Sequence, residues 1–253
     1  MSDWIWALII GFVLDLLLGD PAWLYHPVCL IGKYISWMEK KLRRRGGNLR
    51  KSAVFLTAST VLLTMAVVAL ILMLCGLLGR IPLLIAMALL DWMGIAITSM
   101  AKEARGVEKA LGQGVAAGRT QVGYLDEKYR DIGWSSARLD DVLNYIPARL
   151  TALLMVIASY LIGLDGKNAF RIVRRDHANH KSPNCAWSES AAAGALHIQL
   201  GGTHNYFGKP VEKPTIGDAD RPAERADIRR ANRLLYTSSL LMMALIVLIA
   251  IVR

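Results

Sequence analysis

Apolar residues along this chain of 253 residues gather in long blocks that alternate with polar stretches. No charged residue stands between Ser52 and Gly79, and a helix of this length would extend roughly 42 Å, more than a bilayer core of about 30 Å requires. A second uninterrupted apolar run extends from Leu150 to Leu164. We therefore predict an all-α, polytopic membrane protein that forms a single integral membrane domain over residues 1–253. About four to five membrane segments are expected, near 4–18, 52–78, 81–100, 148–164 and 234–252, with polar regions at 101–147 and 165–233.

The same pattern predicts the helices that flank and form these segments. Leu30–Leu42 is amphipathic, with aromatic residues suited to a membrane interface. We expect a helical hairpin of Ser52–Leu78 and Ile81–Met100, a helical continuation at Lys102–Leu111, and a last helix that begins at Arg225.

Acidic residues interrupt two of the apolar segments. An ionisable residue inside a membrane segment is a functional candidate, so Asp15 is proposed to bind substrate; the alternative is an interfacial carboxylate that binds water or the following turn. Asp91 is expected to face protein or water rather than lipid. After Asp15, the sequence Gly19-Asp20-Pro21 ends the helix, and His26-Pro27 follows in the same irregular turn.

Composition supports the membrane class and excludes others. The chain is 54% hydrophobic and 20% charged, with a net charge of +10 that is concentrated in the connecting loops. We expect no nucleic-acid partner, because no basic face with interleaved aromatic residues is present. The three cysteines are scattered and indicate neither a disulfide framework nor a thiolate metal site. The first apolar run lacks a basic flank and a small-residue cleavage site, so a cleavable signal is not expected.

A strongly basic segment sets the expected orientation. Seven basic residues stand against Glu39 alone, which predicts that this loop faces the cytoplasm: Lys40, Lys41, Arg43, Arg44, Arg45, Arg50 and Lys51.

The stretch from Glu127 to Leu150 is the strongest candidate for a functional site. It places several charged residues directly before an apolar run, which is where an enzyme would hold an ionic substrate at a bilayer surface. The alternative is a solvated loop that caps a membrane helix. The charged candidates are Lys128, Arg130, Asp131, Arg138, Asp140 and Asp141.

Motifs in this stretch and beyond it resemble one known family. RDIGWSSARLDDVLNYIPARLTA, HKSPNCAW and GALHIQLGGTHNYFG, together with LDLLLGDP and HPVCLIGKYI near the start, are similar to the adenosylcobinamide-phosphate synthase family of cobalamin biosynthesis. The resemblance covers about Tyr124–Arg233 and Leu14–Ile35, and is only compositional in the apolar segments. It implies an inner-membrane enzyme with its polar catalytic region on the cytoplasmic side. Such an enzyme joins aminopropanol or its phosphate to the carboxylate of adenosylcobyric acid, a corrinoid, using ATP and Mg²⁺.

One departure from the family pattern affects the expected activity. The family carries a central block after Gln121–Gly123, whereas here Gly123 passes directly to Tyr124, so several dozen residues are expected to be missing. Topology points the same way, because a full span at Leu150–Leu164 would place residues 165–233 outside the cell, opposite to ATP. Either that run is re-entrant or a span has been lost.

The resemblance assigns expected roles to individual residues. Asp140 and Asp141 are proposed Mg²⁺ ligands, although helical neighbours point about 100° apart; the alternatives are helix capping or an ion pair with Arg138. Arg130 and Arg138 suit phosphate or carboxylate, with positive-inside arginines as the alternative. His177 and His180 could share a helical face, but zinc would need more ligands than are visible; His180 is the preferred proton acceptor, with a simple hydrogen-bonded histidine as the alternative. The expected catalytic residues are His180, Arg138 and Asp131, and the expected substrate-binding residues are Asp15, Asp20, His26, Lys128, Arg130, Lys181, Ser182, Asn184 and Tyr206.

LGGTHNYFG is interpreted as a substrate loop in which Tyr206 and Phe207 contact the corrin edge. Three functions are compatible with the sequence: an ATP-dependent amide-forming enzyme, a non-catalytic membrane scaffold or corrinoid binder, and a transporter. The transporter is the least favoured, because the sequence shows no inverted repeat. We expect this shortened chain to bind Mg²⁺ and ATP but to form little or no amide. Membrane lipids, and a homo-oligomer or a complex with other cobalamin-assembly enzymes, are the expected partners.

Overall fold

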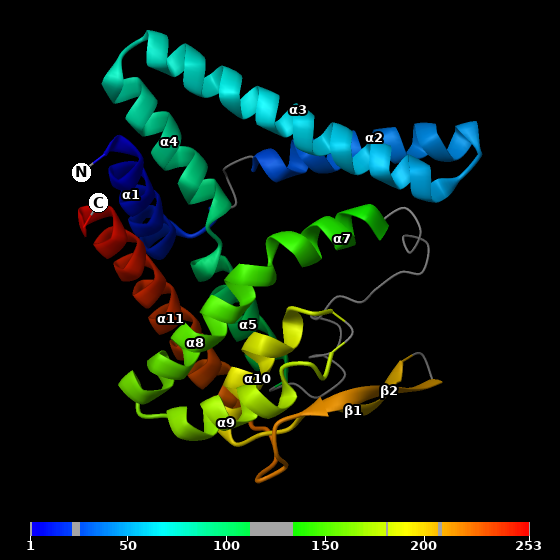
Figure 1. Ribbon diagram of the computed structural model, residues 1–253, viewed down its shortest axis with the longest axis vertical. Coiled ribbons are helices and arrows are strands. Elements are labelled where there is room, and N and C mark those ends of the chain that lie inside the picture. Colours follow the sequence, from blue (N-terminus) through cyan, green and yellow to red (C-terminus); the bar gives the residue numbers. More distant parts are fainter. Residues whose placement is uncertain (1, 22–25, 112–133, 181, 207–208, 253) are drawn as a thin grey trace. The chain divides into compact units, whose positions relative to one another are not determined.

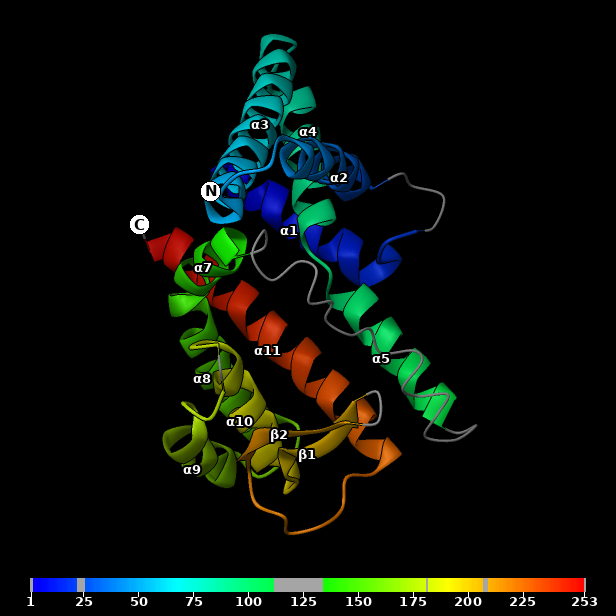
Figure 2. The same ribbon diagram turned by 90° about the vertical axis from the view of Figure 1, so that its right-hand side faces the viewer.

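The computed structural model describes residues 2–21, 26–111, 134–180, 182–206 and 209–252. They fall into two compact units, one of residues 1–100, 124–139 and 250–253, the other of residues 101–123 and 140–249. Helices dominate both units, and within the described ranges the only strands form one hairpin in the second unit (Figures 1 and 2).

The first unit is built mainly from α1 (Asp3–Leu18), α2 (Pro27–Arg45), α3 (Leu49–Leu77) and α4 (Arg80–Gly94). Asn48 begins α3, because its side-chain oxygen accepts the backbone N–H groups of the first turn at 2.9 and 3.3 Å. The most apolar stretch of α3 has no buried residue, as a lipid-facing helix requires. The predicted hairpin is confirmed, since α3 and α4 pack side by side and turn at residues 78–79 (Figure 1).

Helices α1 and α4 approach each other closely at Gly11. A β-carbon added there would lie 2.7 Å from the Asp91 side chain and 2.8 to 2.9 Å from backbone atoms of α4, so only glycine fits. Asp91 therefore faces protein, as predicted. The Trp92 indole N–H donates to the Gly19 carbonyl at 3.0 Å and ties the end of α1 to α4.

The predicted segment Ile81–Met100 lies within one candidate membrane span, Arg80–Lys109, but it is not one continuous helix. The chain leaves the helix after Gly94, and α5 (Ile97–Leu111) begins after two non-helical residues. The first turn of α5 has backbone N–H groups without a partner in the helix. Asp15 of α1 binds one of them, because its Oδ2 accepts the Thr98 N–H at 3.2 Å. The predicted helix at Lys102–Leu111 is confirmed as part of α5.

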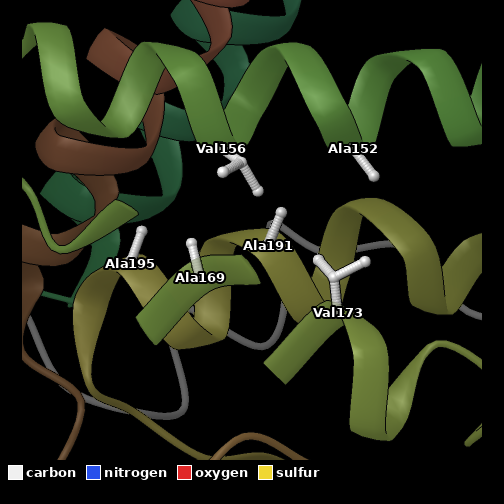
Figure 3. Packing of buried hydrophobic residues seen from close by; sticks show 6 residues of the cluster. All are labelled: Ala152, Val156, Ala169, Val173, Ala191 and Ala195. Carbon is white, nitrogen blue, oxygen red and sulfur yellow. The ribbon is translucent and has the colours of Figure 1, made fainter. Parts of the chain in front are cut away.

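The core of the second unit lies between α8 (Tyr145–Leu161), α9 (Gly166–Asp176) and α10 (Cys185–Leu196). Its side chains are small, which allows the three backbones to come close together (Figure 3). Gly194 brings the backbones of α9 and α10 close together, because a β-carbon there would lie 2.7 Å from Cα of Ala169. The six core residues are Ala152, Val156, Ala169, Val173, Ala191 and Ala195.

The stretch LGGTHNYFG does not form the predicted loop. Leu200–Tyr206 is strand β1, and it pairs antiparallel with β2 (Lys209–Ile216) in a register that sets Leu200 opposite Ile216 and Gly202 opposite Lys213. Gly201 and Gly202 both have φ above +80°, and the register shifts at this point. Two-stranded pairing leaves both strands as edges, which is why the prolines of β2 are tolerated.

Long apolar helices confirm the predicted all-α, polytopic membrane class. Three described stretches are long and apolar enough to cross a membrane: Leu49–Leu77, Arg80–Lys109 and Arg225–Val252. A fourth arises if α7 (Trp134–Leu143) and α8 count as one span; they meet at a 52° bend, as in a broken span or a re-entrant loop. The final helix begins at Arg225 as predicted and forms α11 (Arg225–Val252).

Candidate functional site

The three N-terminal candidates gather around the break between α4 and α5. Asp15 is fully buried and caps α5, while the backbone N–H of Asp20 donates to the Ser99 hydroxyl at 3.2 Å. His26 accepts the Val28 N–H through Nδ1, so Nε2 carries the proton that it donates to the Met93 carbonyl at 3.0 Å. These contacts hold the first unit together, and a role in substrate binding stays a prediction.

The second unit joins the end of α7 to the turn before α10. The Ser182 hydroxyl donates to Asp141 Oδ1 at 3.1 Å, and the Asn184 side-chain amide donates to the Asp141 carbonyl at 2.8 Å. The Ser182 N–H is bound by His180 Nδ1 at 3.0 Å, which tightens the turn further. Sequence reasoning named all four residues, and the structure brings them to one place.

An arginine that sequence reasoning missed completes this site. The Arg149 guanidinium lies over the rings of Tyr145 and Trp187, 3.4 and 4.7 Å from their centroids. Its Nη1 donates to the Tyr145 carbonyl at 2.5 Å and approaches Asn184 Oδ1 at 3.5 Å. Its Nε and Nη2 donors have no partner among the described residues. They form one edge of a planar fork that suits a carboxylate or phosphate.

The two histidines near this site differ in which ring nitrogen carries the proton. His177 and His180 do not share a helical face as considered, because α9 ends at Asp176. His177 stacks on Trp187 at 4.4 Å and donates through Nδ1 to the Val173 carbonyl at 2.9 Å, which leaves the Nε2 lone pair available. His180 uses its Nδ1 lone pair on Ser182 and carries its proton on Nε2.

The carboxylates of Asp140 and Asp141 have different neighbours. Asp140 is exposed and accepts the Asn144 side-chain amide at 2.8 Å, whereas Asp141 is half-buried against Ser182. In the described part of the chain no three His, Cys, Asp or Glu side chains are grouped to hold a metal ion. One carboxylate beside a hydroxyl does fit Mg²⁺ that keeps most of its ligands as water and phosphate oxygens. Asp141, rather than the pair, would hold such an ion.

For the remaining predicted site residues, the structure shows at most the helix that carries them and their exposure. Arg138 is exposed on α7, three residues before Asp141. Outside the described residues lie Lys128, Arg130, Asp131 and Lys181, and the side chain of Tyr206.

A second polar network fastens the loop after β2 to α9. Asp176 is 3% exposed, and it accepts Arg175 at 2.6 and 2.8 Å and the Gly217 N–H at 2.8 Å. The Arg175 hydrogen bonds, supported by Gly217, hold the pKa of Asp176 below its usual value despite burial. Arg171 and Arg175 likewise bind Asp218 and lower its pKa.

Beside this network, His197 links two more carboxylates. It adopts a left-handed backbone with φ of 54°, and its two ring nitrogens lie 3.1 Å from Asp165 and 2.9 Å from Asp220. Neither network was predicted, because apart from the neighbours Arg175 and Asp176 the partners are far apart along the chain and no spacing connects them.

The chain is similar to known proteins along most of its length. A family model described as "CobD/Cbib protein" matches residues 8–125 and 120–235. "Cobalamin biosynthesis protein CobD" from Geobacter metallireducens is 37% identical over 92% of this chain and 92% of its own length. The protein of the same name from Clostridium perfringens is 36% identical over 96% of each chain. "Cobalamin biosynthesis protein CbiB" from Salmonella typhimurium is 57% identical over 51% of this chain and 40% of its own length. No solved structure matches.

The alignments also bear on the expected missing block. The Geobacter alignment has 294 positions, more than the 253 residues of this chain, so part of the relative is opposite gaps. The family match is split into two segments that meet at residues 120–125, where the block was expected to be missing. With both segments matched and its relatives aligned over nine-tenths of its length, this chain belongs to the CobD/CbiB family of cobalamin biosynthesis proteins.

Proposed function

We propose that the polar site of the second unit serves the amide condensation of adenosylcobyric acid with aminopropanol or aminopropanol phosphate. The observation that supports this most directly is the arrangement of Arg149. Its guanidinium lies over the rings of Tyr145 and Trp187 and beside the Asn184 side-chain amide, and its Nε and Nη2 donors have no partner among the described residues. The substrates suit such a site, because one carries a carboxylate and the other an amine or a phosphate.

Each residue of the site has a part in this proposal. Arg149 grips a carboxylate or phosphate through two parallel hydrogen bonds, and the rings of Tyr145 and Trp187 prevent it from turning away. Asp141 holds Mg²⁺, oriented by Ser182 and Asn184. ATP would supply the activation of the corrinoid carboxylate. The surrounding turn then has only to align the two reacting groups.

The ammonium of the amine must lose a proton before it can attack a carbonyl carbon. We assign this proton to Nε2 of His177, whose ring is fixed by Val173 and Trp187. His180 is the histidine that the sequence favoured as the proton acceptor. We give it a structural role in the turn instead, because protonation of its Nδ1 would break the hydrogen bond from Ser182. His177→Ala is therefore expected to affect turnover in an active relative more than His180→Ala.

The split family match favours a second candidate function for this shortened chain. Without the central block, the site can keep its ligands while the reacting groups are misaligned, and a misplacement of about 1 Å can cost on the order of 100-fold in rate. The chain would then act as a corrinoid or nucleotide binder, or as a scaffold in the membrane.

Binding of Mg²⁺ and ATP to the detergent-solubilised chain tests the site directly. Calorimetry with Asp141→Asn is expected to show affinity lowered at least about 10-fold, because a metal-bound carboxylate is lost. Asp140→Asn is the matched control, with the same chemical change one residue away, and its affinity should equal that of the original chain. Equal losses in both variants, or in neither, would contradict the assignment of Asp141. A parallel assay of amide formation distinguishes the two candidate functions, because only an enzyme would form the product.

A further inference from the structure

The face of α9 that points away from the core is basic and surrounds an aromatic ring. Ala169, Ile172 and Val173 are buried against α8 and α10, while the opposite face is open. A cavity of about 650 Å³ lies along this face and α9 supplies six of the seven side chains around it: Asp165, Lys167, Asn168, Phe170, Arg171, Arg174 and Arg175.

Two of the four cations on this face have no counter-charge. Arg171 and Arg175 are engaged by Asp218, but the side chains of Lys167 and Arg174 make no ion pair or hydrogen bond with described residues. They are seven residues apart, two turns along one face of the helix. Phe170 lies between them and is 45% exposed. The face therefore offers two unpaired positive charges on either side of an apolar ring.

A hydrogen bond from α11 places the start of α9 near the membrane surface. Arg233 is the last charged residue before the apolar part of α11, residues 234–252, whose length of roughly 28 Å matches the bilayer core. Its Nη2 donates to the carbonyl of Ile162 at 3.3 Å, at the end of α8 and four residues before α9. Tyr160 packs on Gly166 at the same corner, where a β-carbon would lie 2.4 Å from the ring. Aromatic side chains of this kind are typical of the interface.

We propose that the basic face of α9 binds the phosphate of an anionic phospholipid, with Lys167 and Arg174 on the headgroup and Phe170 at the acyl boundary. Charge complementarity and the depth set by Arg233 both indicate a lipid, rather than a soluble phosphate, as the occupant. The proposal is independent of the condensation site, whose residues lie on α7, α8, α10 and the turn between α9 and α10.

A fluorescent reporter on α9 tests this with defined lipids. Cys29, Cys75 and Cys185 are replaced by serine and Phe170 by cysteine, which is labelled with bimane, an apolar ring system. The full chain in neutral detergent is titrated with phosphatidylglycerol or phosphatidylcholine. We expect tighter binding of phosphatidylglycerol. Lys167→Gln/Arg174→Gln should weaken it about 25-fold, because each basic residue near an anionic surface contributes about fivefold.

Arg44→Gln/Arg45→Gln is the matched control, since it removes the same charge from the exposed end of α2. It should leave the reporter response unchanged, and thermal unfolding should show that both double variants are folded. Equal binding of the two lipids, or an unaltered response in Lys167→Gln/Arg174→Gln, would overturn the proposal. Competition by inorganic phosphate at the lipid's own concentration would identify a soluble phosphate as the occupant and overturn it equally.

Discussion

Asp176 shows how single side chains stabilise the second unit. Its carboxylate is almost removed from solvent, yet the guanidinium of Arg175 binds both of its oxygens and Gly217 adds a backbone donor. Burial of a charge is costly unless its hydrogen-bonding capacity is filled in this way. Removal of the charge should therefore destabilise the unit strongly, although Asp176 itself is given no part in the proposed chemistry.

Asp176→Asn is expected to lower the free energy of unfolding by about 3 kcal/mol. Because the folded-state pKa lies below the unfolded value of 3.8, the charge stabilises the fold at pH values above 3.8. That contribution is lost as the pH falls from about 4 toward the folded-state pKa. Denaturant unfolding in detergent from pH 3 to 7 should thus show a steeper acid loss in the original chain than in the variant. Asp140→Asn, at an exposed position, should change stability by less than about 0.5 kcal/mol; an equal effect would remove the special role of Asp176.

The residues of the candidate site were predictable only in part. Asp141, Ser182 and Asn184 stand in two motifs, and the motifs name them without showing that they touch. Arg149 was missed because its importance comes from Trp187, which approaches it only after α8 and α10 pack. The spacing of residues along the sequence does not predict such a contact.

At the scale of elements, long apolar helices were predictable and local interruptions were not. Helices α3 and α11 are long and apolar enough to cross a bilayer core, which leaves little choice of structure. The break at Ile95 depends instead on Asp15, which supplies a hydrogen-bond acceptor from another helix. The β-hairpin was hidden because Pro210 and Pro214 argue against a strand, and only its two-stranded form tolerates them.

Close packing of α9 against α10 leads to a prediction for Gly194. Gly194→Ala would place a methyl group against the backbone of Ala169 and Asn168 and is expected to destabilise the second unit by about 1 to 3 kcal/mol. Gly32→Ala, on the open face of α2, has no atom within 4 Å and should be neutral or slightly stabilising. Thermal unfolding in detergent compares the two. Tolerance of alanine at position 194 would mean that the helices are further apart than described.

At the scale of the whole molecule, the split family match is the feature on which the predicted lack of amide formation rests. Both matched segments keep their motifs, and they meet at residues 120–125. Substrate binding by the matched segments and substrate alignment by the central block can therefore be tested separately in this chain.

Insertion of the central block of the Geobacter relative between Gly123 and Tyr124 is expected to restore amide formation. Growth of a synthase-deficient strain without added cobinamide is the measurement, beside membrane levels of both proteins. The original chain should fail to support growth, because alignment of the reacting groups is lost. Growth with the unmodified chain would show that the block is dispensable.

The loop after β2 has a consequence for the order in which the protein is made. Its residues bind partners on both sides of it along the chain: Gly217 and Asp218 meet α9, Asp220 meets His197, and Arg221 meets Asp227, which is made later, at the start of α11. A nascent chain that ends before this loop lacks Asp218, which is the counter-charge of Arg171 and the second carboxylate bound by Arg175. Once residue 227 has been synthesised, every partner of these loop contacts exists, while the apolar part of α11 is still to be made. At roughly 5 to 20 residues per second, residues 234–252 take about 1 to 4 seconds to synthesise, so the partners of the loop all exist seconds before the span is complete.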